Sequence, residues 1–238
     1  MKILIVNDDG IYAEGIRRLV LWAKQWAEVM VCAPKTQQSG TSQAVNFITT
    51  IEAKPVTLDY APDVTAWYVD STPADCIRIA YYYLNWRPDL VLSGINKGLN
   101  MGEDIGYSGT DGAIFEASYA GLNAIAVSTH PADFKDAAEA LDGLKDYFVK
   151  RDLLSHCNLW NINIPENPKD ILLTRQGGPY YRDRFEHVGN NQYEAHGYSA
   201  LVNEYNLELD TNAVMCGYTS VTPLTTVHTN WDVYNKLK

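Results

Sequence analysis

The sequence predicts an α/β protein with a doubly wound, mostly parallel sheet and helices on both faces, because short apolar runs alternate with segments of helical periodicity. Residues 2–6 are a predicted strand, and apolar residues then recur at helical spacing from Ile16 to Trp26. A second predicted strand, at residues 29–33, stops at Pro34. Strand, helix and strand in this order indicate a parallel βαβ unit.

The same alternation continues to residue 164. Residues 64–69 are a predicted strand, and Thr72-Pro73-Ala74-Asp75 follows with an N-cap residue, a proline at the first helical position and a carboxylate at the third. These features are typical of a helix start. The other elements predicted here are a strand at 89–93, a helix from 108 to about 121, a strand at 124–128, a helix marked by Ala137, Leu141, Leu144 and Phe148, and a strand at 159–164.

Beyond residue 165 the alternation weakens. Residues 166–210 are polar segments rich in tyrosine and containing glycine, which indicates a β-rich extension or arm. A short helix at 211–216, a strand at 218–222 and a terminal helix at 230–237 are predicted after it. We therefore expect an α/β core at 1–165 and a β-rich remainder at 166–238 that belongs to the same domain.

Composition and charge argue against several classes of function. The formal net charge of −10 disfavours binding to nucleic-acid polymers, whose phosphate backbone requires clustered Lys and Arg. Small phosphorylated ligands remain open if a bound divalent cation reverses the negative field locally. The four cysteines are too far apart in the sequence for a zinc site, and the five histidines show no HExxH spacing.

The apolar runs of the sequence are short. None is long enough to cross a membrane, and the first one, at residues 3–6, is too short for the core of a signal peptide. We therefore expect a cytoplasmic protein without membrane contact.

The candidate site consists of polar residues that follow predicted strands, because ligands of open α/β sheets bind beyond the carboxyl ends of the strands. Asp8 and Asp9 follow the first strand, and helical periodicity after Gly10 disfavours a hairpin turn at this Asp-Gly pair. Two adjacent carboxylates repel each other, and at least one pKa is raised unless a cation compensates them. Asp8 and Asp9 are therefore the predicted metal-binding centre.

Three further segments have a structural and a functional interpretation. Ser39 lies in a polar loop that is either ordinary surface or part of the site. Asn96 either occupies a left-handed turn or joins Lys97 in a glycine-rich loop that approaches an anion. Ser108-Gly109-Thr110 opens a helix, and there the two interpretations agree, since capping and phosphate binding use the same backbone N–H groups.

Together these segments resemble the SurE survival-protein family of 5′-nucleotidases, which have a Rossmann-like core. The resemblance is carried by Asn7-Asp8-Asp9-Gly10, Ala33-Pro34, Gln38-Ser39-Gly40, Thr72-Pro73-Ala74-Asp75-Cys76, Ser93-Gly94-Ile95-Asn96 and Tyr107-Ser108-Gly109-Thr110, in the same order and spacing. It implies one metal ion held by Asp8, Asp9, Ser39 and Asn96. It also implies catalytic roles for Asp8, Asp9 and Asn96, and phosphate binding by Asn96, Ser108, Gly109 and Thr110.

The resemblance further implies hydrolysis of nucleoside 5′-monophosphates, also of 3′-monophosphates and short polyphosphate, by a catalytic core at residues 1–165. It implies a homodimer or homotetramer built partly through the arm. Two positions depart from the family pattern: Gln43 stands where His is usual, and Asp111 where a small apolar residue is usual. A carboxylate at Asp111 suits the helix dipole but repels phosphate.

The expected ligands are hard oxygen atoms, which favour Mg²⁺ or Mn²⁺, and Asp8 is the expected base or water-positioning residue. Two alternatives stay open at this point. One is a phosphatase with an aspartyl-phosphate intermediate, although such enzymes usually carry two aspartates two positions apart. The other is a non-enzymatic phosphoreceiver-like signalling domain, although Ser93 occupies the place of the phosphoacceptor aspartate.

Overall fold

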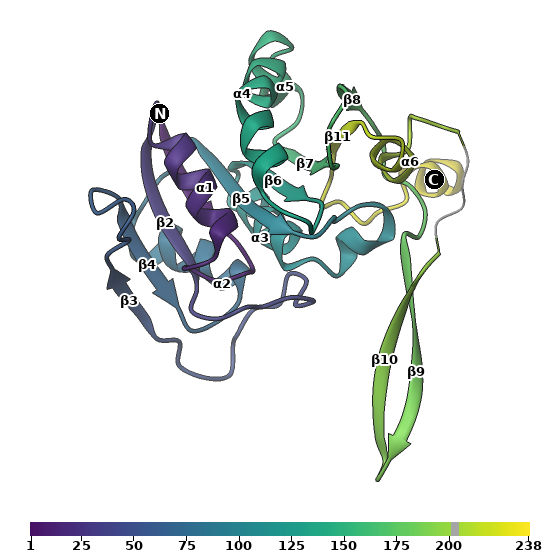
Figure 1. Cartoon of the computed structure of the whole chain (residues 1–238), viewed down its shortest axis with the longest axis horizontal. Coiled ribbons are helices and arrows are strands. Elements are labelled where there is room, and N and C mark those ends of the chain that lie inside the picture. Colours follow the sequence, from purple (N-terminus) through teal and green to yellow (C-terminus); the bar gives the residue numbers. More distant parts are fainter. Residues whose placement is uncertain (201–204) are drawn as a thin grey trace.

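The computed structural model describes residues 1–200 and 205–238, and its centre is a nine-stranded sheet (Figure 1). From edge to edge the strands of this sheet are β3 (Ala53–Val56), β4 (Thr65–Val69), β2 (Glu28–Pro34), β1 (Lys2–Val6), β5 (Leu90–Lys97), β6 (Asn123–Thr129), β7 (Leu159–Ile164), β11 (Thr219–Pro223) and β8 (Ile171–Leu173). The β3–β4 and β7–β11 pairs are antiparallel, and the other pairs are parallel. The predicted fold class is therefore confirmed.

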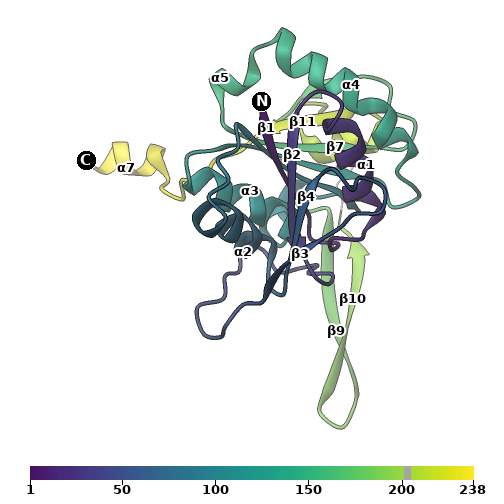
Figure 2. The ribbon, with the colours of Figure 1, turned by 90° about the vertical axis from the view of Figure 1, so that its left-hand side faces the viewer.

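Helices cover both faces of this sheet. Successive side chains of a strand point to opposite faces, so each central strand contributes to two core clusters. Ile3 and Ile5 pack in one core cluster with α1 (Glu14–Ala23) and α4 (Lys135–Lys150). Leu4 and Val6 pack in a second cluster with α2 (Pro73–Arg78) and α3 (Gly109–Tyr119). Figure 2 shows these two helix layers with the sheet between them. Burial on both faces explains why the central strands read as continuous apolar runs.

The helix start predicted at Thr72 is confirmed. The Thr72 side chain accepts a hydrogen bond from the Asp75 backbone N–H at 3.2 Å, and Pro73 is the first helical residue. A π-helical turn at Ile79–Tyr83 continues α2. Other short elements are a 3₁₀ turn at Gly102–Gly106, α5 (Leu153–His156) and α6 (Asp210–Met215).

Strand β5 is longer than the sequence analysis predicted. Residues 94–97 were expected to open a loop, but they extend the strand to Lys97. The register between β5 and β6 shifts between Gly94 and Asn96. Gly94 has a φ of +134°, and a Cβ there would lie 2.3 Å from the Val127 carbonyl oxygen, so only glycine allows this irregular strand to stay paired.

The polar segment after residue 165 forms an arm, and the strands on either side of it return to the main sheet. Strands β9 (Tyr181–Gly189) and β10 (Gln192–Ser199) pair as an antiparallel hairpin that extends away from the core (Figure 1). Strand β11 lies between β7 and β8, so the main sheet includes residues on both sides of residue 165. Helix α7 (Trp231–Leu237) also projects from the core, in a different direction from the hairpin, and has no buried residue (Figure 2).

Candidate functional site

The candidate site lies at the carboxyl ends of three adjacent strands. Strand β1 pairs with β2 on one side and with β5 on the other, so the segments that follow these strands meet at one edge of the sheet. Asn7 is buried and closes the turn after β1, donating from Nδ2 to the Gly10 carbonyl at 2.9 Å and accepting from the Gly10 N–H at 3.2 Å. This turn holds Asp8 and Asp9 at the sheet edge.

The loop that carries Ser39 is attached to Asp8. The backbone N–H of Gln38 donates to the Asp8 carbonyl oxygen at 2.7 Å. Ser39 itself is exposed, and its Oγ accepts a hydrogen bond from Gln37 Nε2 at 3.0 Å. The direct contact between this loop and the acidic pair is therefore made by Gln38, the residue before the predicted ligand Ser39.

Asn96 approaches the acidic pair from β5. Its neighbour Lys97 donates a backbone hydrogen bond to Asp9 Oδ2 at 3.3 Å. The Asn96 side chain donates from Nδ2 to the Gly98 carbonyl at 2.8 Å, so the amide oxygen is the atom left for a cation. Asn96 is a strand residue and does not have a positive φ, so the alternative of a left-handed turn is wrong.

The predicted phosphate turn contacts Asp8 directly. Thr110 donates from Oγ1 to Asp8 Oδ1 at 2.6 Å, across 102 positions of sequence. A Cβ added at Gly109 would lie 3.0 Å from Asp8 Cβ, so the turn can approach this closely only with glycine there. Ser108 caps α3 by accepting from the Asp111 N–H at 3.0 Å. The amino end of α3, where backbone N–H groups lack helical partners, therefore lies against the acidic pair.

The electrostatics of Asp8 and Asp9 fit a cation site. Burial raises the pKa of Asp8 to about 6, the Thr110 hydrogen bond opposes that rise, and the neighbouring Asp9 charge adds to it. Burial also raises the pKa of Asp9, against the lowering effects of the Lys97 backbone N–H and charge. Two carboxylates held in this way favour a divalent cation, because its charge would stabilise both ionised forms.

Asp111 is an acidic group that the sequence singled out only as a departure from the family. It is fully buried, and neither carboxylate oxygen has a hydrogen-bond partner within the described residues. Burial raises its pKa well above the ordinary value, the Ser108 side chain lowers it, and the charges of Asp8 and Asp210 raise it further. The raised pKa favours the neutral carboxyl group, which weakens the expected repulsion of phosphate.

Asp210 and Asn100 are two positioning residues that the sequence analysis did not identify. Buried Asp210 accepts from the backbone N–H groups of Gly102 and Gly177, at 2.9 and 2.7 Å. Asn100 is held by Asn163, which accepts from its N–H at 2.7 Å and donates to its carbonyl at 2.9 Å. Both interactions fix the loop after β5. For Asn100, the signal available in the sequence was the pair of asparagines, Asn161 and Asn163, inside the apolar strand 159–164.

Gln43, the other departure from the family pattern, points to α3. Its Nε2 donates to Glu116 Oε2 at 3.0 Å, and Glu116 also lies 3.5 Å from Arg78. Gln43 therefore links its loop to the helix layer, and the described contacts do not join it to Asp8 or Asp9.

The surroundings of the site and the helices have two further properties. Within residues 1–200 and 205–238, no group of three or more His, Cys, Asp or Glu side chains is arranged to hold a metal ion. The candidate site offers two such residues together with a hydroxyl and an amide, so its cation would depend on mixed oxygen ligands. None of the helices in these same ranges is both long and apolar enough to span a bilayer.

An open, mostly parallel α/β sheet with two carboxylates and a helix amino terminus at the carboxyl ends of its strands defines the class: an α/β protein with a candidate strand-end site. The model of the SurE survival protein family matches residues 3–183. The chain belongs to this family, and the resemblance inferred from the motifs is confirmed.

Similar proteins cover nearly the whole chain. A protein of Fervidobacterium nodosum named 5′-nucleotidase SurE is 35% identical, with 100% of this chain and 96% of that protein aligned. Another of the same name, from Thermosipho melanesiensis, is 34% identical over the same shares of both chains. The crystal structure of the SurE protein from Aquifex aeolicus is 32% identical, covers 100% of this chain and 98% of its own, and superposes with a TM-score of 0.82.

Proposed function

We propose that this chain hydrolyses the phosphomonoester bond of nucleoside 5′-monophosphates, giving nucleoside and phosphate. The observation that carries the proposal is the hydrogen bond from Thr110 to Asp8, because it joins a phosphate-binding helix terminus to an acidic pair. Relatives named 5′-nucleotidase SurE support the same activity. We extend the proposal to 3′-monophosphates and short polyphosphate, which present the same terminal phosphate to the turn.

The residues at the site fit one Mg²⁺ or Mn²⁺ ion. Asp8 and Asp9 would contribute carboxylate oxygens, Ser39 a hydroxyl and Asn96 an amide oxygen, which is a hard ligand set without thiolate or imidazole. The raised pKa values of both aspartates are the observation that favours a cation there. When bound, the ion supplies positive charge that offsets the two carboxylates and the phosphate.

The chain's own residues would perform the other steps. The amino end of α3, at Ser108-Gly109-Thr110, binds the phosphate oxygens and stabilises the charge that they share in the transition state. Asp8 would position the attacking water and accept its proton, because its carboxylate lies against the phosphate turn. Thr110 orients the carboxylate of Asp8, and Asn96 contacts the phosphate from β5.

The receiver-like alternative lacks a feature that it requires. Ser93 occupies the position where a phosphoacceptor carboxylate would be needed, and it is fully buried inside the sheet. The aspartyl-phosphate alternative makes a distinct chemical prediction. Rapid quenching during turnover would trap a phosphate covalently bound to Asp8 or Asp9, whereas direct attack by water leaves no such adduct.

Phosphate release with Mg²⁺, with Mn²⁺ and with EDTA tests the proposal across 5′-monophosphates, 3′-monophosphates and tripolyphosphate. We expect metal-dependent turnover that Asp8→Asn lowers by about 1,000-fold while the circular dichroism spectrum is unchanged. Asp59→Asn is the matched control, because Asp59 is an exposed carboxylate in a loop away from this edge. Near-normal turnover by Asp8→Asn would remove the proposed centre.

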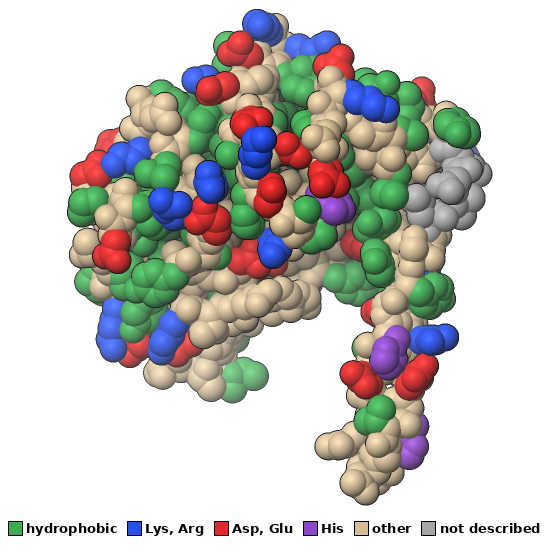
Figure 3. Space-filling view, in the orientation of Figure 1, with side chains coloured by type: hydrophobic (Ala, Val, Ile, Leu, Met, Phe, Trp, Pro, Cys, Tyr) green, Lys and Arg blue, Asp and Glu red, His purple; other side chains and the backbone are tan. Residues whose placement is uncertain are grey.

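We also propose that the chain forms a homodimer or homotetramer through its arm and terminal helix. Large hydrophobic side chains are exposed there, including Phe185 at 71%, Tyr193 at 65% and Trp231 at 55%. Figure 3 shows hydrophobic, charged and histidine side chains interspersed along the projecting hairpin. Sedimentation velocity should give a dimer or larger species, and deletion of residues 228–238 should shift it toward the monomer. A monomer at micromolar concentration would contradict this assignment.

A further inference from the structure

A separate apolar cavity lies between α1 and α4, on the face of the sheet opposite α2 and α3. Its volume is about 360 Å³, which falls in the range of small-molecule sites. Leu92 and Val127 of the sheet form its floor. Met1 and Leu90, at the amino ends of β1 and β5, line one end of it. The cavity is therefore distinct from the candidate site, which lies at the carboxyl ends of the same strands.

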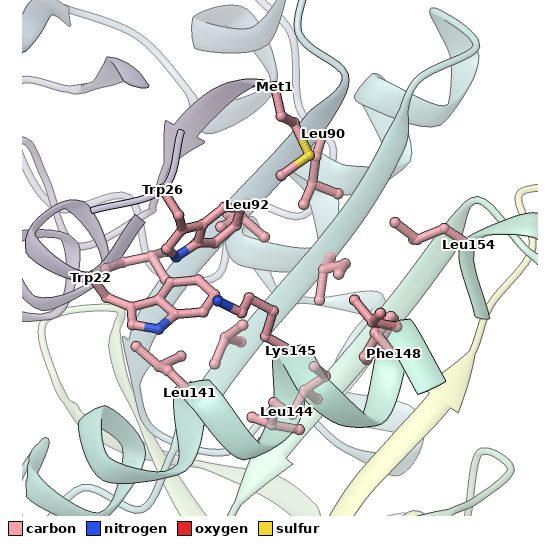
Figure 4. Close-up of a pocket in the computed structure, with 15 residues that line it drawn as sticks. Met1, Trp22, Trp26, Leu90, Leu92, Leu141, Leu144, Lys145, Phe148 and Leu154 are labelled. Carbon is pink, nitrogen blue, oxygen red and sulfur yellow. The ribbon is translucent and has the colours of Figure 1, made fainter. Parts of the chain in front are cut away.

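The walls of the cavity come from the two helices. Figure 4 shows Trp22 and Trp26 facing Leu144, Lys145 and Phe148 across the sheet, the tryptophans coming from α1 and the turn after it. Apolar side chains line the cavity everywhere except at Lys145. An engineered apolar cavity of about 150 Å³ stays free of water and binds benzene, so a larger cavity with such a lining favours an apolar guest.

One charged side chain, Lys145, lines this cavity. Lys145 Nζ lies 4.9 Å from the centre of the Trp26 ring and makes no ion pair within the described residues. Trp26 Nε1 is a buried donor without an acceptor in the same part of the chain. Asp142, three residues before Lys145 on α4, accepts from Trp22 Nε1 at 2.9 Å. Because the Trp26 N–H is buried, Lys145 is the polar group of the lining that a ligand can reach.

We propose that this cavity binds an amphiphile with an apolar chain and a single carboxylate, of the medium-chain fatty-acid class. The chain would fill the space between α1 and α4 over Leu92 and Val127. The carboxylate would pair with Lys145, the cation that lines the cavity. This proposal is independent of the nucleotidase activity, because the carboxyl edge of the sheet takes no part in it.

Titration calorimetry with decanoate and with the neutral decanol, both below micelle-forming concentrations, tests this assignment. The protein should carry its native amino terminus, because Met1 lines the cavity. We expect saturable binding of both ligands and tighter binding of decanoate. Absence of saturable decanoate binding would overturn the proposal. A second copy of the chain that fills the cavity would give this same result.

Variants separate the two parts of the assignment. Lys145→Met should weaken decanoate about 10-fold and decanol less than about 2-fold, because only the acid uses the ammonium group. Lys150→Met is the control, since Lys150 lies on the same helix outside the cavity lining. Leu144→Phe should weaken both ligands at least about 10-fold by filling the space. Equal losses of both ligands in Lys145→Met, or full affinity in a folded Leu144→Phe protein, would refute the site.

Discussion

Thr110, in the first turn of α3, donates a hydrogen bond to the carboxylate of Asp8 in the turn after β1, with 2.6 Å between the two oxygens. This contact joins the helix terminus that would bind phosphate to the acidic pair that would hold the cation. It also lowers the pKa of Asp8 against the raising effect of burial. The phosphate turn and the protonation state of the candidate base are therefore coupled through one hydroxyl group.

The first prediction concerns this hydroxyl. Thr110→Val should raise the pKa of Asp8 and move the acidic limb of the activity profile to higher pH, because the lost hydrogen bond stabilises the ionised carboxylate. A hydrogen bond to a charged group contributes about 1.5–3 kcal/mol, so kcat/KM should fall roughly 10- to 100-fold. Thr110→Ser, which keeps the hydroxyl, should retain the wild-type profile. Superimposable profiles for Thr110→Val and wild type would exclude the coupling.

The second prediction is a pH-dependent stability of the metal-free protein. The pKa of Asp8 rises on folding from 3.8 to about 6, so the folded state binds the proton more tightly. The stability contributed by this group is complete below pH 3.8 and is lost as pH rises through about 6. At about 1.36 kcal/mol per pKa unit, the loss is on the order of 3 kcal/mol.

Asp8→Asn should abolish that loss, because the amide does not ionise. In urea unfolding with EDTA, the difference in unfolding free energy between Asp8→Asn and wild type should grow between pH 4 and pH 7 in favour of the variant. The inactive variant would then be the more stable protein at neutral pH, as expected for a group retained for function. A constant difference across this range would show that burial of Asp8 does not affect stability.

The third prediction concerns buried Asp111, whose carboxylate oxygens have no described partner. Asp111→Val should stabilise the protein by about 1–3 kcal/mol at pH 7.5, because it removes an unsatisfied buried polar group. The gain should shrink as pH falls, since the raised pKa means that the wild-type protein recovers stability on protonation. Asp146→Asn, an exposed carboxylate on α4, should change the unfolding free energy by less than about 0.5 kcal/mol. Destabilisation by Asp111→Val would indicate an unseen partner for Asp111.

The fourth prediction compares two glycines. Gly109→Ala should lower kcat/KM at least about 10-fold, since the new Cβ would lie 3.0 Å from both Asp8 Cβ and Thr41 Oγ1 and would push the phosphate turn outward. Gly143→Ala should leave activity unchanged and stabilise α4 by about 0.5–1 kcal/mol, because nothing lies within 4 Å of its Cβ position. Activity assays and thermal unfolding of both variants provide the measurement. Full activity in Gly109→Ala would show that the turn tolerates displacement.

Local signals in the sequence identified most of the elements. The Thr72 to Asp75 helix start is confirmed because capping depends on neighbours within four residues. Helix α1 ends at Ala23, three residues before the last apolar position of its predicted periodicity. Trp26 faces the α1–α4 cavity from the turn that follows, so tertiary packing produced the same spacing without a helix. Strand β3 was not predicted, because Ala53–Val56 contains a proline, which is tolerated only at a sheet edge.

The sequence by itself determined the α/β class, the adjacent carboxylates Asp8 and Asp9, and the capped turn at Ser108. Only the tertiary structure decided that β5 lies beside β1, which brings Lys97 to Asp9, and that Thr110 reaches Asp8. It also decided that Asp111 is buried without a partner. The reason is physical: helix caps and apolar periodicity act over a few residues, whereas strand order and the desolvation of a carboxylate depend on segments that burial brings together from distant parts of the chain.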